Sequence, residues 1–334
     1  MTLDVDFAAR IDPFRRDLLA HCYRMLGSVH DAEDLVQETM LRAWRAFARY
    51  DPARSSMRTW LYRIATNACL TALEQRSRRP LPSGLGGPDD EPDRPLVRGE
   101  EVPWLEPVPD AMVADPTDAL VSLRLAFVAA LQHLPARQRA VLILREVLSW
   151  PAADVATALG MTTAAVNSAL QRARAHLDAA GLAEDEIVEP GDARTQVDRY
   201  VTAFRNADLA ALEKLLTDDV TLEMPPFLTW FRGRDAYLRF TARGFTLRGT
   251  DWRMLPTAAN GQPAVAAYTA TGDGYALHSL QVFTVTAAGI SHTTVFQDHA
   301  VFDKFGLAGR NPGDDVENGG GGSDLTPTLP PVGA

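Results

Sequence analysis

The chain has 334 residues, 46% of them hydrophobic, and a formal charge of −10 from 33 basic and 43 acidic residues. This composition predicts a globular protein of two or three domains and excludes a fibrous protein or a small disulfide scaffold. The two cysteines, Cys22 and Cys69, lie in apolar helical patterns, which predicts a reducing compartment, no disulfide and no metal cluster. No glycine-rich phosphate loop of the required form is present, so we expect no cofactor. Charged residues alternate with apolar ones at the N-terminus and no apolar run reaches membrane length, so we expect a cytoplasmic protein.

The charge is unevenly distributed along the chain. Residues 1–80 and 119–180 each carry +3, whereas residues 81–118 and 181–334 each carry −8. Between residues 42 and 79, nine arginines oppose two acidic residues, and five aromatic residues lie among them, namely Trp44, Phe47, Tyr50, Trp60 and Tyr62. Positive charge interleaved with aromatic rings is typical of surfaces that bind phosphates and unstacked bases. A solvated, arginine-rich helix face has the same composition and remains an alternative.

The first predicted domain, residues 1–79, is helical, with apolar residues at helical spacing and breaks at Gly27-Ser28 and Asp51-Pro52. The acidic segment 80–118 follows and contains nine prolines, which predicts an extended linker with little capacity to form a core. An apolar patch at 102–105, centred on Trp104, interrupts this linker. We expect the patch to dock on a target that the sequence does not identify.

Residues 119–181 are predicted to be helical again and contain a candidate helix-turn-helix at 153–177. Gly160 allows a sharp turn, and Thr162 or Thr163 can cap the second helix. One stripe of that helix is apolar and is expected to face the core, through Val166, Leu170, Ala173 and Leu177. The opposite stripe carries small, polar and basic residues suited to a major groove, namely Ala164, Asn167, Ser168, Gln171, Arg172 and Arg174. Two packed helices with a polar outer face would show the same pattern.

Residues 193–306 change to a mixed pattern that predicts an α+β domain. A helix is expected at 195–216, and strands at 220–224, 263–271, 276–286 and 289–301, with turns at Asn260-Gly261, 272–274 and Ala288-Gly289. The segment 311–334 contains four consecutive glycines and four prolines, which predicts a disordered tail.

Several motifs in residues 10–180 resemble the extracytoplasmic-function (ECF) group of bacterial sigma factors. YRMLGS at 23–28, DAEDLVQET at 31–39 and TWLYRIATNA at 59–68 are similar in order and spacing to regions 2.1 to 2.4 of that family. LPARQR at 134–139, together with the helix-turn-helix, resembles region 4. The resemblance implies two all-α sigma domains, a region 2 bundle and a region 4 helix-turn-helix, that bind RNA polymerase core and promoter DNA and initiate transcription.

The resemblance also implies roles for particular residues. The helix 30–47 would bind the clamp helices of the largest polymerase subunit through Asp34, Gln37, Glu38, Leu41 and Arg42, and region 4 would meet the flap of the second-largest subunit. The −10 element would be contacted by Arg54, Ser55, Ser56, Met57, Arg58, Trp60, Arg63 and Asn67. The −35 element would be contacted by Thr162, Thr163, Ala164, Asn167, Ser168, Gln171, Arg172 and Arg174. A favourable acidic helix N-terminus is the alternative for the polymerase-binding helix, and a core position is the alternative for Trp60.

Residues 193–306 resemble the SnoaL-like group of the nuclear-transport-factor-2-like (NTF2-like) fold, on the motifs at 216–226 and 231–237. This implies a domain built as a cone of sheet and helices around a pocket, and this domain is expected to regulate the sigma half. The pocket is a candidate site for an unknown small ligand. The pocket candidates are Glu223, Trp230, Tyr237, Trp252, Tyr268, His278, Asp298 and His299, and packing or surface roles are the alternative for each. A small-molecule-transforming enzyme of the cyclase or isomerase type, fused to a DNA-binding half, is the alternative function.

Overall fold

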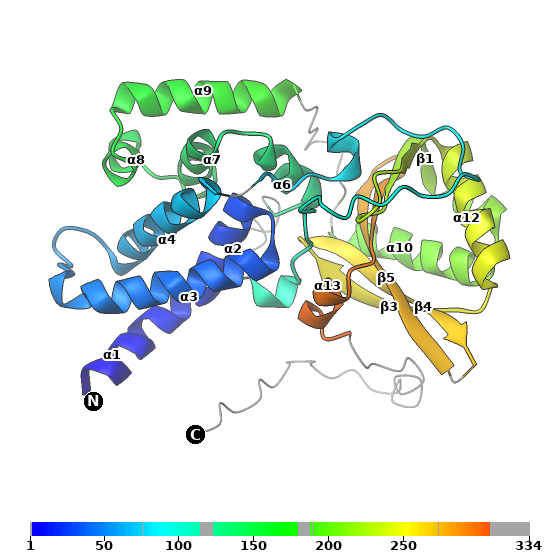
Figure 1. Ribbon diagram of the computed structural model, residues 1–334, viewed down its shortest axis with the longest axis horizontal. Helices are drawn as coiled ribbons and strands as arrows, with labels where there is room; N and C mark the ends of the chain where they lie inside the picture. The colour runs from blue at the N-terminus through cyan, green and yellow to red at the C-terminus, as the bar shows by residue number, and fades with distance from the viewer. Residues whose placement is uncertain are drawn as a thin grey trace.

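The computed structural model describes residues 2–75, 77–113, 123–179, 188, 190–272 and 274–307. A helical half and a half built around a β-sheet lie side by side, and the segment 80–113 runs from the helical half out across the sheet half and back (Figure 1). The predicted tail at 311–334 and the predicted boundaries at 118 and 181 lie outside the described residues.

The N-terminal helices form a bundle around α2. They are α1 (Thr2–Ile11), α2 (Arg15–Leu26), α3 (Val29–Ala46) and α4 (Met57–Leu73), with short helices at Asp12–Phe14 and Phe47–Arg49. Every residue of α2 from Leu18 to Leu26 is buried, because α3 and α4 pack against it together with two later helices. The predicted break is confirmed: Gly27 ends α2 at a φ of 70°, and the Ser28 side chain caps α3 by accepting from the Asp31 N–H.

The second helical unit contains the helix-turn-helix. Its elements are α6 (Leu125–Gln132), α7 (Ala136–Leu142), a π-helical turn (Ile143–Val147), α8 (Ala152–Leu159) and α9 (Thr163–Ala179). Gly160 ends α8 at a φ of 62°, and Thr162, one of the two candidate caps, accepts from the Ala165 N–H at 3.1 Å. Of the predicted inward stripe, Val166, Leu170 and Ala173 are buried.

The predicted helix at 195–216 is wrong in its second half. The chain instead forms α10 (Pro190–Arg205) and α11 (Leu209–Glu213), and β1 begins at Leu216. Ala207 has a positive φ of 51°, and the Asp208 side chain accepts from the Ala211 N–H to start a new helix. Asn206, Ala207 and Asp208 therefore separate two helices, because the Asp208 side chain caps a new helix instead of extending α10.

One six-stranded sheet organises the rest of the chain. Its strands are β1 (Leu216–Glu223), β2 (Trp230–Arg232), β3 (Trp252–Ala259), β4 (Gln262–Thr271), β5 (Gly274–Thr286) and β6 (Gly289–Phe296), and their order is β2-β1-β6-β5-β4-β3. Only β1 and β6 pair in parallel. The sequence did not predict β2 and β3, and the strand predicted to reach residue 301 ends at Phe296, because Asp298 caps α13 (His299–Lys304).

Both faces of the sheet are buried. Val265 and Ala267 of β4 belong to a core shared with α10 and α12 (Arg234–Arg248), whereas Ala264, Ala266 and Tyr268 belong to the core of the helical half. This alternation follows from the two-residue period of a strand. The outer face of the sheet therefore serves as a docking surface for the helices.

The linker is extended, as predicted, but the expectation that it forms little core is wrong. Leu81, Leu105, Val108 and Val113 are buried and join the core of the helical half. A proline-rich segment has few internal hydrogen bonds, and its backbone is instead paired with residues far away in sequence, as in the bond from the Glu106 N–H to the Gly27 carbonyl. Composition predicts such a conformation but not where it docks.

The turn between β3 and β4 joins three parts of the chain. Asn260, which has no solvent exposure, donates from Nδ2 to the Tyr23 hydroxyl (2.8 Å) and to the Leu123 carbonyl (2.6 Å). Its Oδ1 accepts from the Val108 N–H at 2.9 Å. Asn260 and Gly261 have φ values of 59° and 66°, so the predicted Asn-Gly turn is confirmed.

Candidate functional site

The connection between α3 and α4 is held in place by local hydrogen bonds. Ser56 caps α4 by accepting from the Thr59 N–H at 3.1 Å, and the Tyr50 hydroxyl donates to the Ser55 carbonyl at 3.1 Å. Arg54 and Ser56 are exposed, and Ser55 is half-buried. The predicted −10 residues of this connection thus form one ordered, accessible edge.

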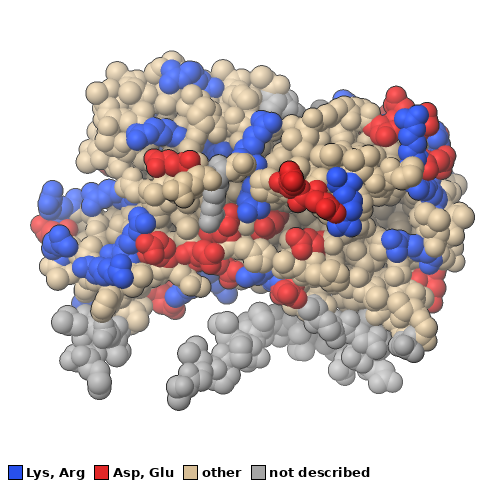
Figure 2. Space-filling view, in the orientation of Figure 1, with Lys and Arg blue, Asp and Glu red and all other residues tan. Residues whose placement is uncertain are grey.

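The outer face of α4 continues this surface. Arg63 and Asn67 are exposed one turn apart, and Met57 is half-buried. Arg58 is exposed, with its guanidinium 5.3 Å from the centre of the Tyr62 ring. Figure 2 shows Lys and Arg side chains gathered at this end of the molecule, over the connection between α3 and α4, whereas Asp and Glu gather over the middle of α3.

Trp60 differs from the other predicted −10 residues. It is 7% exposed, and its ring centre lies 4.9 Å from that of Tyr50. Trp60 is therefore a core residue of the bundle, which is the alternative to a −10 contact for this residue.

The outer face of α3 carries the residues predicted to bind polymerase. Asp34, Gln37, Leu41 and Arg42 are exposed, and Glu38 is half-buried. The Arg42 Nε lies 2.7 Å from the Glu38 carboxylate, one turn earlier. Leu41 is 41% exposed and Trp44, three residues later, is 50% exposed. Positions three and four apart share a helix face, so α3 presents an apolar patch of Leu41 and Trp44 between charged groups.

The N-terminus of α3 is closed by a carboxylate from the linker. Glu106 Oε2 accepts from the Ser28 hydroxyl (2.8 Å) and the Val29 N–H (3.0 Å), and lies 2.9 Å from His30 Nδ1. An anion at a helix N-terminus is stabilised by the unpaired N–H groups and the helix dipole. No local pattern predicts this contact, because Glu106 is 78 residues from Ser28.

The outward stripe of α9 is fully accessible. All eight predicted −35 residues, from Thr162 to Arg174, are exposed. Arg172 donates to the Ser168 hydroxyl at 2.7 Å, and Arg174 lies 2.7 Å from the Glu146 carboxylate. The side chains of this stripe are therefore oriented within their own unit and remain open to a partner, and α9 lies along one edge of the molecule (Figure 1).

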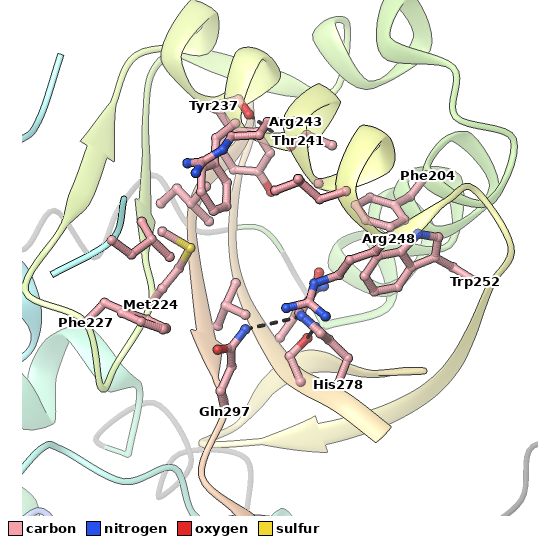
Figure 3. A pocket seen from close by; sticks show the side chains of 18 of the residues that line it. Phe204, Met224, Phe227, Tyr237, Thr241, Arg243, Arg248, Trp252, His278 and Gln297 are labelled. Atoms are coloured by element: carbon pink, nitrogen blue, oxygen red, sulfur yellow. Dashed lines mark hydrogen bonds between the residues drawn. The ribbon is translucent and has the colours of Figure 1, made fainter. Parts of the chain in front are cut away.

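The C-terminal half encloses a cavity of about 200 Å³ between α10, α12 and the inner face of the sheet (Figure 3). Three of the predicted pocket residues line it, namely Tyr237, Trp252 and His278. The Tyr237 hydroxyl lies 2.9 Å from the Tyr200 hydroxyl and donates to Thr293 at 3.1 Å. Burial raises the pKa of both tyrosines, so each is a neutral hydroxyl.

His278 is neutral in this cavity at physiological pH. Burial, and then the nearby Arg248 charge, lower the pKa of His278 to about 4. Its Nε2 lies 3.4 Å from Gln297 Nε2 and its Nδ1 lies 3.2 Å from the Ser279 hydroxyl. Figure 3 shows His278, Gln297 and Arg248 together on one side of the cavity.

The other predicted pocket residues lie elsewhere, and the prediction is wrong for them. Tyr268 is on the outer face of the sheet, among the side chains of the helical half. Trp230 donates from Nε1 to the linker carbonyl of Gly86 at 3.0 Å. Asp298 caps α13 by accepting from the Ala300 N–H, and His299 is exposed on the first turn of that helix.

Glu223 is also outside the cavity, at the end of β1. It has no solvent exposure, and its carboxylate lies 2.9 Å from His292 Nε2 and accepts from the linker N–H of Ser83 at 2.7 Å. Burial alone would raise the pKa of this carboxyl, but His292 and the Ser83 N–H together lower it below its usual value. Glu223 is therefore an anchor for the linker.

Several residues of the cavity are not among those predicted from the sequence. Tyr200 and Phe204 come from α10, where Val197, Tyr200 and Phe204 follow helical spacing and could have indicated an inward face. Gln281 of β5 and Leu96 of the linker also line the cavity. No local pattern marks Leu96, because its place depends on the docking of the linker.

Three family models match the chain: Sigma-70 region 2 at residues 11–79, Sigma-70 region 4 at 124–177, and the SnoaL-like domain at 197–295. Over 312 residues the chain is 49% identical to the ECF RNA polymerase sigma factor SigG of Mycobacterium tuberculosis, which covers 90% of this chain and 84% of that protein. The chain belongs to the ECF RNA polymerase sigma factors. The sigma factor is also 29% identical over 245 residues to SigJ of the same species, covering 70% of this chain and 71% of SigJ.

The crystal structure of M. tuberculosis SigJ shares the fold of this sigma factor, with a TM-score of 0.63 and 26% identity over 89% of this chain and 98% of SigJ. The predicted fold class is confirmed: two helical sigma domains and an α+β SnoaL-like domain. As a sigma factor the chain binds RNA polymerase core and promoter DNA to initiate transcription. Cys22 and Cys69 are both buried and are not joined by a disulfide. No helix in the described ranges combines the length and apolarity needed to cross a membrane.

Proposed function

We propose that the sigma factor contacts the −10 element with the α3–α4 connection and α4, and the −35 element with α9. The observation that carries this is the exposure of both sets of polar and basic side chains on ordered helices, while their apolar neighbours are buried. Arginines hold phosphates, and amides or hydroxyls bond base edges. We further propose that the outer face of α3 binds the clamp helices of the largest polymerase subunit and that the second helical unit binds the flap of the second-largest subunit. Both contacts are proposed to form in the cytoplasm, where polymerase acts.

Transcription in vitro tests the DNA surfaces. Polymerase core loaded with this sigma factor would first select its promoter from a randomised library. Arg63→Ala and Arg172→Ala should each lower transcription from that promoter at least tenfold and make it less sensitive to salt, because each removes a phosphate contact. Arg205→Ala, at the exposed end of α10, removes the same charge away from both surfaces and should have no effect. Equal activity of all three variants would contradict the assignment.

We infer that the SnoaL-like domain regulates activity by holding the two sigma units and the linker together. Asn260 supports this role, because its side chain forms hydrogen bonds to α2, to the linker and to the segment before α6. Gln262 adds a second link, since its Oε1 accepts from the Leu125 N–H at 2.9 Å. Lys304 of α13 also pairs with Glu33 of α3, next to the proposed polymerase-binding face. The acidic charge of this half disfavours DNA near the closed molecule.

Full-length Asn260→Lys tests this regulation, because it places a charge in the buried junction and should open it. We expect more transcription than wild type when polymerase core is limiting. Asn206→Lys, an exposed change in the same domain, is the matched control and should behave as wild type. Unchanged or reduced transcription by Asn260→Lys, with wild-type binding to polymerase, would exclude a restraining role.

For the cavity we propose binding rather than turnover. The relatives are sigma factors, and none of the described residues that line the cavity carries a carboxylate. The enzyme alternative stays a prediction without a specific observation in its favour.

A further inference from the structure

The cavity of the SnoaL-like domain has the size and lining of a small-molecule site. Its volume of about 200 Å³ exceeds the 150 Å³ or so of an engineered apolar cavity that binds benzene. Aromatic and aliphatic side chains make up most of its wall, among them Phe204, Leu222, Met224, Phe240 and Trp252. Leu247 at its rim is 70% exposed, so the cavity reaches the surface beside α12.

One buried polar atom in this wall has nothing to bond. Gln281 of β5 is 6% exposed, and its Oε1 has no hydrogen-bond partner among the described residues. The other buried polar side chains among the described lining residues are paired. Tyr237 bonds Tyr200 and Thr293, Thr241 donates to the Tyr237 carbonyl, and the Ser279 hydroxyl lies 3.2 Å from His278 Nδ1. A buried acceptor without a partner is costly, and native structures rarely keep one without a bound molecule or a function. A ligand that donates a hydrogen bond to Gln281 would remove this cost.

The linker between the sigma domains forms part of the same wall. Leu96 lines the cavity, and Arg243, another lining residue on α12, donates to the linker carbonyls of Pro92 (2.7 Å) and Arg94 (2.8 Å). The Val97 N–H donates to the Thr229 hydroxyl at 2.9 Å, which fixes the next residue of the linker. A molecule in the cavity therefore touches the linker only while the linker is docked.

We propose that the cavity binds an aromatic compound of one or two rings that carries a hydroxyl group, with the rings among the aromatic side chains and the hydroxyl donating to Gln281 Oε1. Because Leu96 completes the site, the protein binds the ligand more tightly when its linker is docked than when the linker is released. The ligand therefore stabilises the closed arrangement. The ligand would then be a signal for the regulation proposed above, and only this last step rests on that proposed function.

Binding of 2-naphthol to the full-length protein tests the site, with 2-methoxynaphthalene as the probe of similar shape that has no donor. Equilibrium dialysis should show 2-naphthol binding about tenfold more tightly than the ether. Gln281→Leu should keep binding of the ether and abolish the preference, since it removes the acceptor and leaves an apolar wall. Equal affinity of the wild type for the two probes, or binding of neither, would overturn the proposal.

The role of the linker is tested by two neighbouring substitutions. Leu96→Trp should fill the cavity from the linker side and weaken 2-naphthol binding at least tenfold, whereas Val97→Trp, at a position that is 57% exposed, should leave it unchanged. Saturating 2-naphthol should slow amide hydrogen exchange in residues 94–99 several-fold in the wild type and not in Leu96→Trp. Unaltered binding by Leu96→Trp, or unaltered exchange in the wild type, would show that the linker is not part of the site.

The binding and exchange measurements use no polymerase, so they succeed or fail independently of the regulation. If 2-naphthol binds and protects the linker, the site stands. Transcription by the same protein with and without 2-naphthol then decides the proposed function separately, and a fall in transcription with the ligand is expected.

Discussion

Gly27 is a residue on which the contact between three segments depends. It ends α2 at a φ of 70°, and a Cβ there would lie 2.9 Å from Leu105 Cδ1 of the linker and 3.0 Å from Gln132 Cδ of α6. Gly27→Ala should therefore lower the free energy of unfolding by about 1 kcal/mol from the backbone conformation alone, and further from the displaced linker. Urea denaturation measures the sum.

Gly160 provides the matched control for Gly27. It ends α8 at a similar φ of 62°, but a Cβ there would meet no atom within 4 Å. Gly160→Ala should thus report the backbone strain without the crowding. If the two alanine variants were equally stable, the close approach of Leu105 to Gly27 would have no energetic consequence.

Two histidines make stability depend on pH between 7 and 5. Burial, and then the Arg24 charge, lower the pKa of His21 to about 3, and burial, then Arg248, lower that of His278 to about 4. Between pH 6.5 and about 4 both histidines stay neutral in the folded protein while those of the unfolded chain take up protons, so stability falls as pH falls through this range. Each histidine should contribute a loss of about 1 kcal/mol between pH 7 and 5.5.

Urea denaturation of the wild type and His278→Gln at pH 7 and 5.5 checks this. The variant should lose about 1 kcal/mol less than the wild type over that interval, whereas His299→Gln, on the exposed start of α13, should match the wild type. The same pH dependence in His278→Gln as in the wild type would mean that His278 is not held neutral by burial.

Residue roles were predictable where one helix determines them. The outward stripes of α4 and α9 follow from helical spacing, and their exposure in the structure agrees with it. The roles of Glu223 and Glu106 were not predictable, because each carboxylate acts on a partner tens of residues away, Ser83 and Ser28 respectively. The place of Tyr268 was not predictable either, because both faces of β4 are buried and its apolar pattern does not show which face lies over the cavity.

At the scale of elements, α3 offers a test of polymerase binding. Leu41 and Trp44 are exposed apolar residues among charged ones, and such side chains commonly anchor a partner. Leu41→Asp should weaken binding to polymerase core at least tenfold, as measured by surface-immobilised core.

Leu247→Asp on α12 is the matched control for Leu41→Asp, since Leu247 is even more exposed, at 70%. It should bind core as the wild type does. Equal binding by both aspartate variants would place the polymerase contact away from this face of α3.

Elements with strong local signals were predicted best. The break at Gly27-Ser28, the turn after α8 and the Asn260-Gly261 turn follow from the backbone that each residue favours. The strand β2 has three residues and β3 contains Pro256, so neither has the pattern of a strand by itself. Their neighbours in the sheet specify them, and a single sequence does not show which segments are neighbours.

For the whole molecule, the continuity of its core predicts that the two halves unfold together. One apolar cluster runs from the N-terminal bundle through the linker and the second helical unit to the outer face of the sheet. Burial of this docking surface therefore stabilises both halves. If the halves unfolded in separate transitions, Tyr268 and the helices packed against it would be exposed to water.

Val265→Ala distinguishes joint from separate unfolding. Val265 is 1% exposed and lies on the inner face of β4, in the core shared with α10 and α12 and not in that of the helical half. The truncation should cost about 2 kcal/mol. Native-state hydrogen exchange in low denaturant should then show the same loss of protection in peptides from β4 and from α2, because both exchange through one global opening. If β4 lost protection and α2 kept all of its own, the halves would unfold independently and the docked sheet would stabilise only itself.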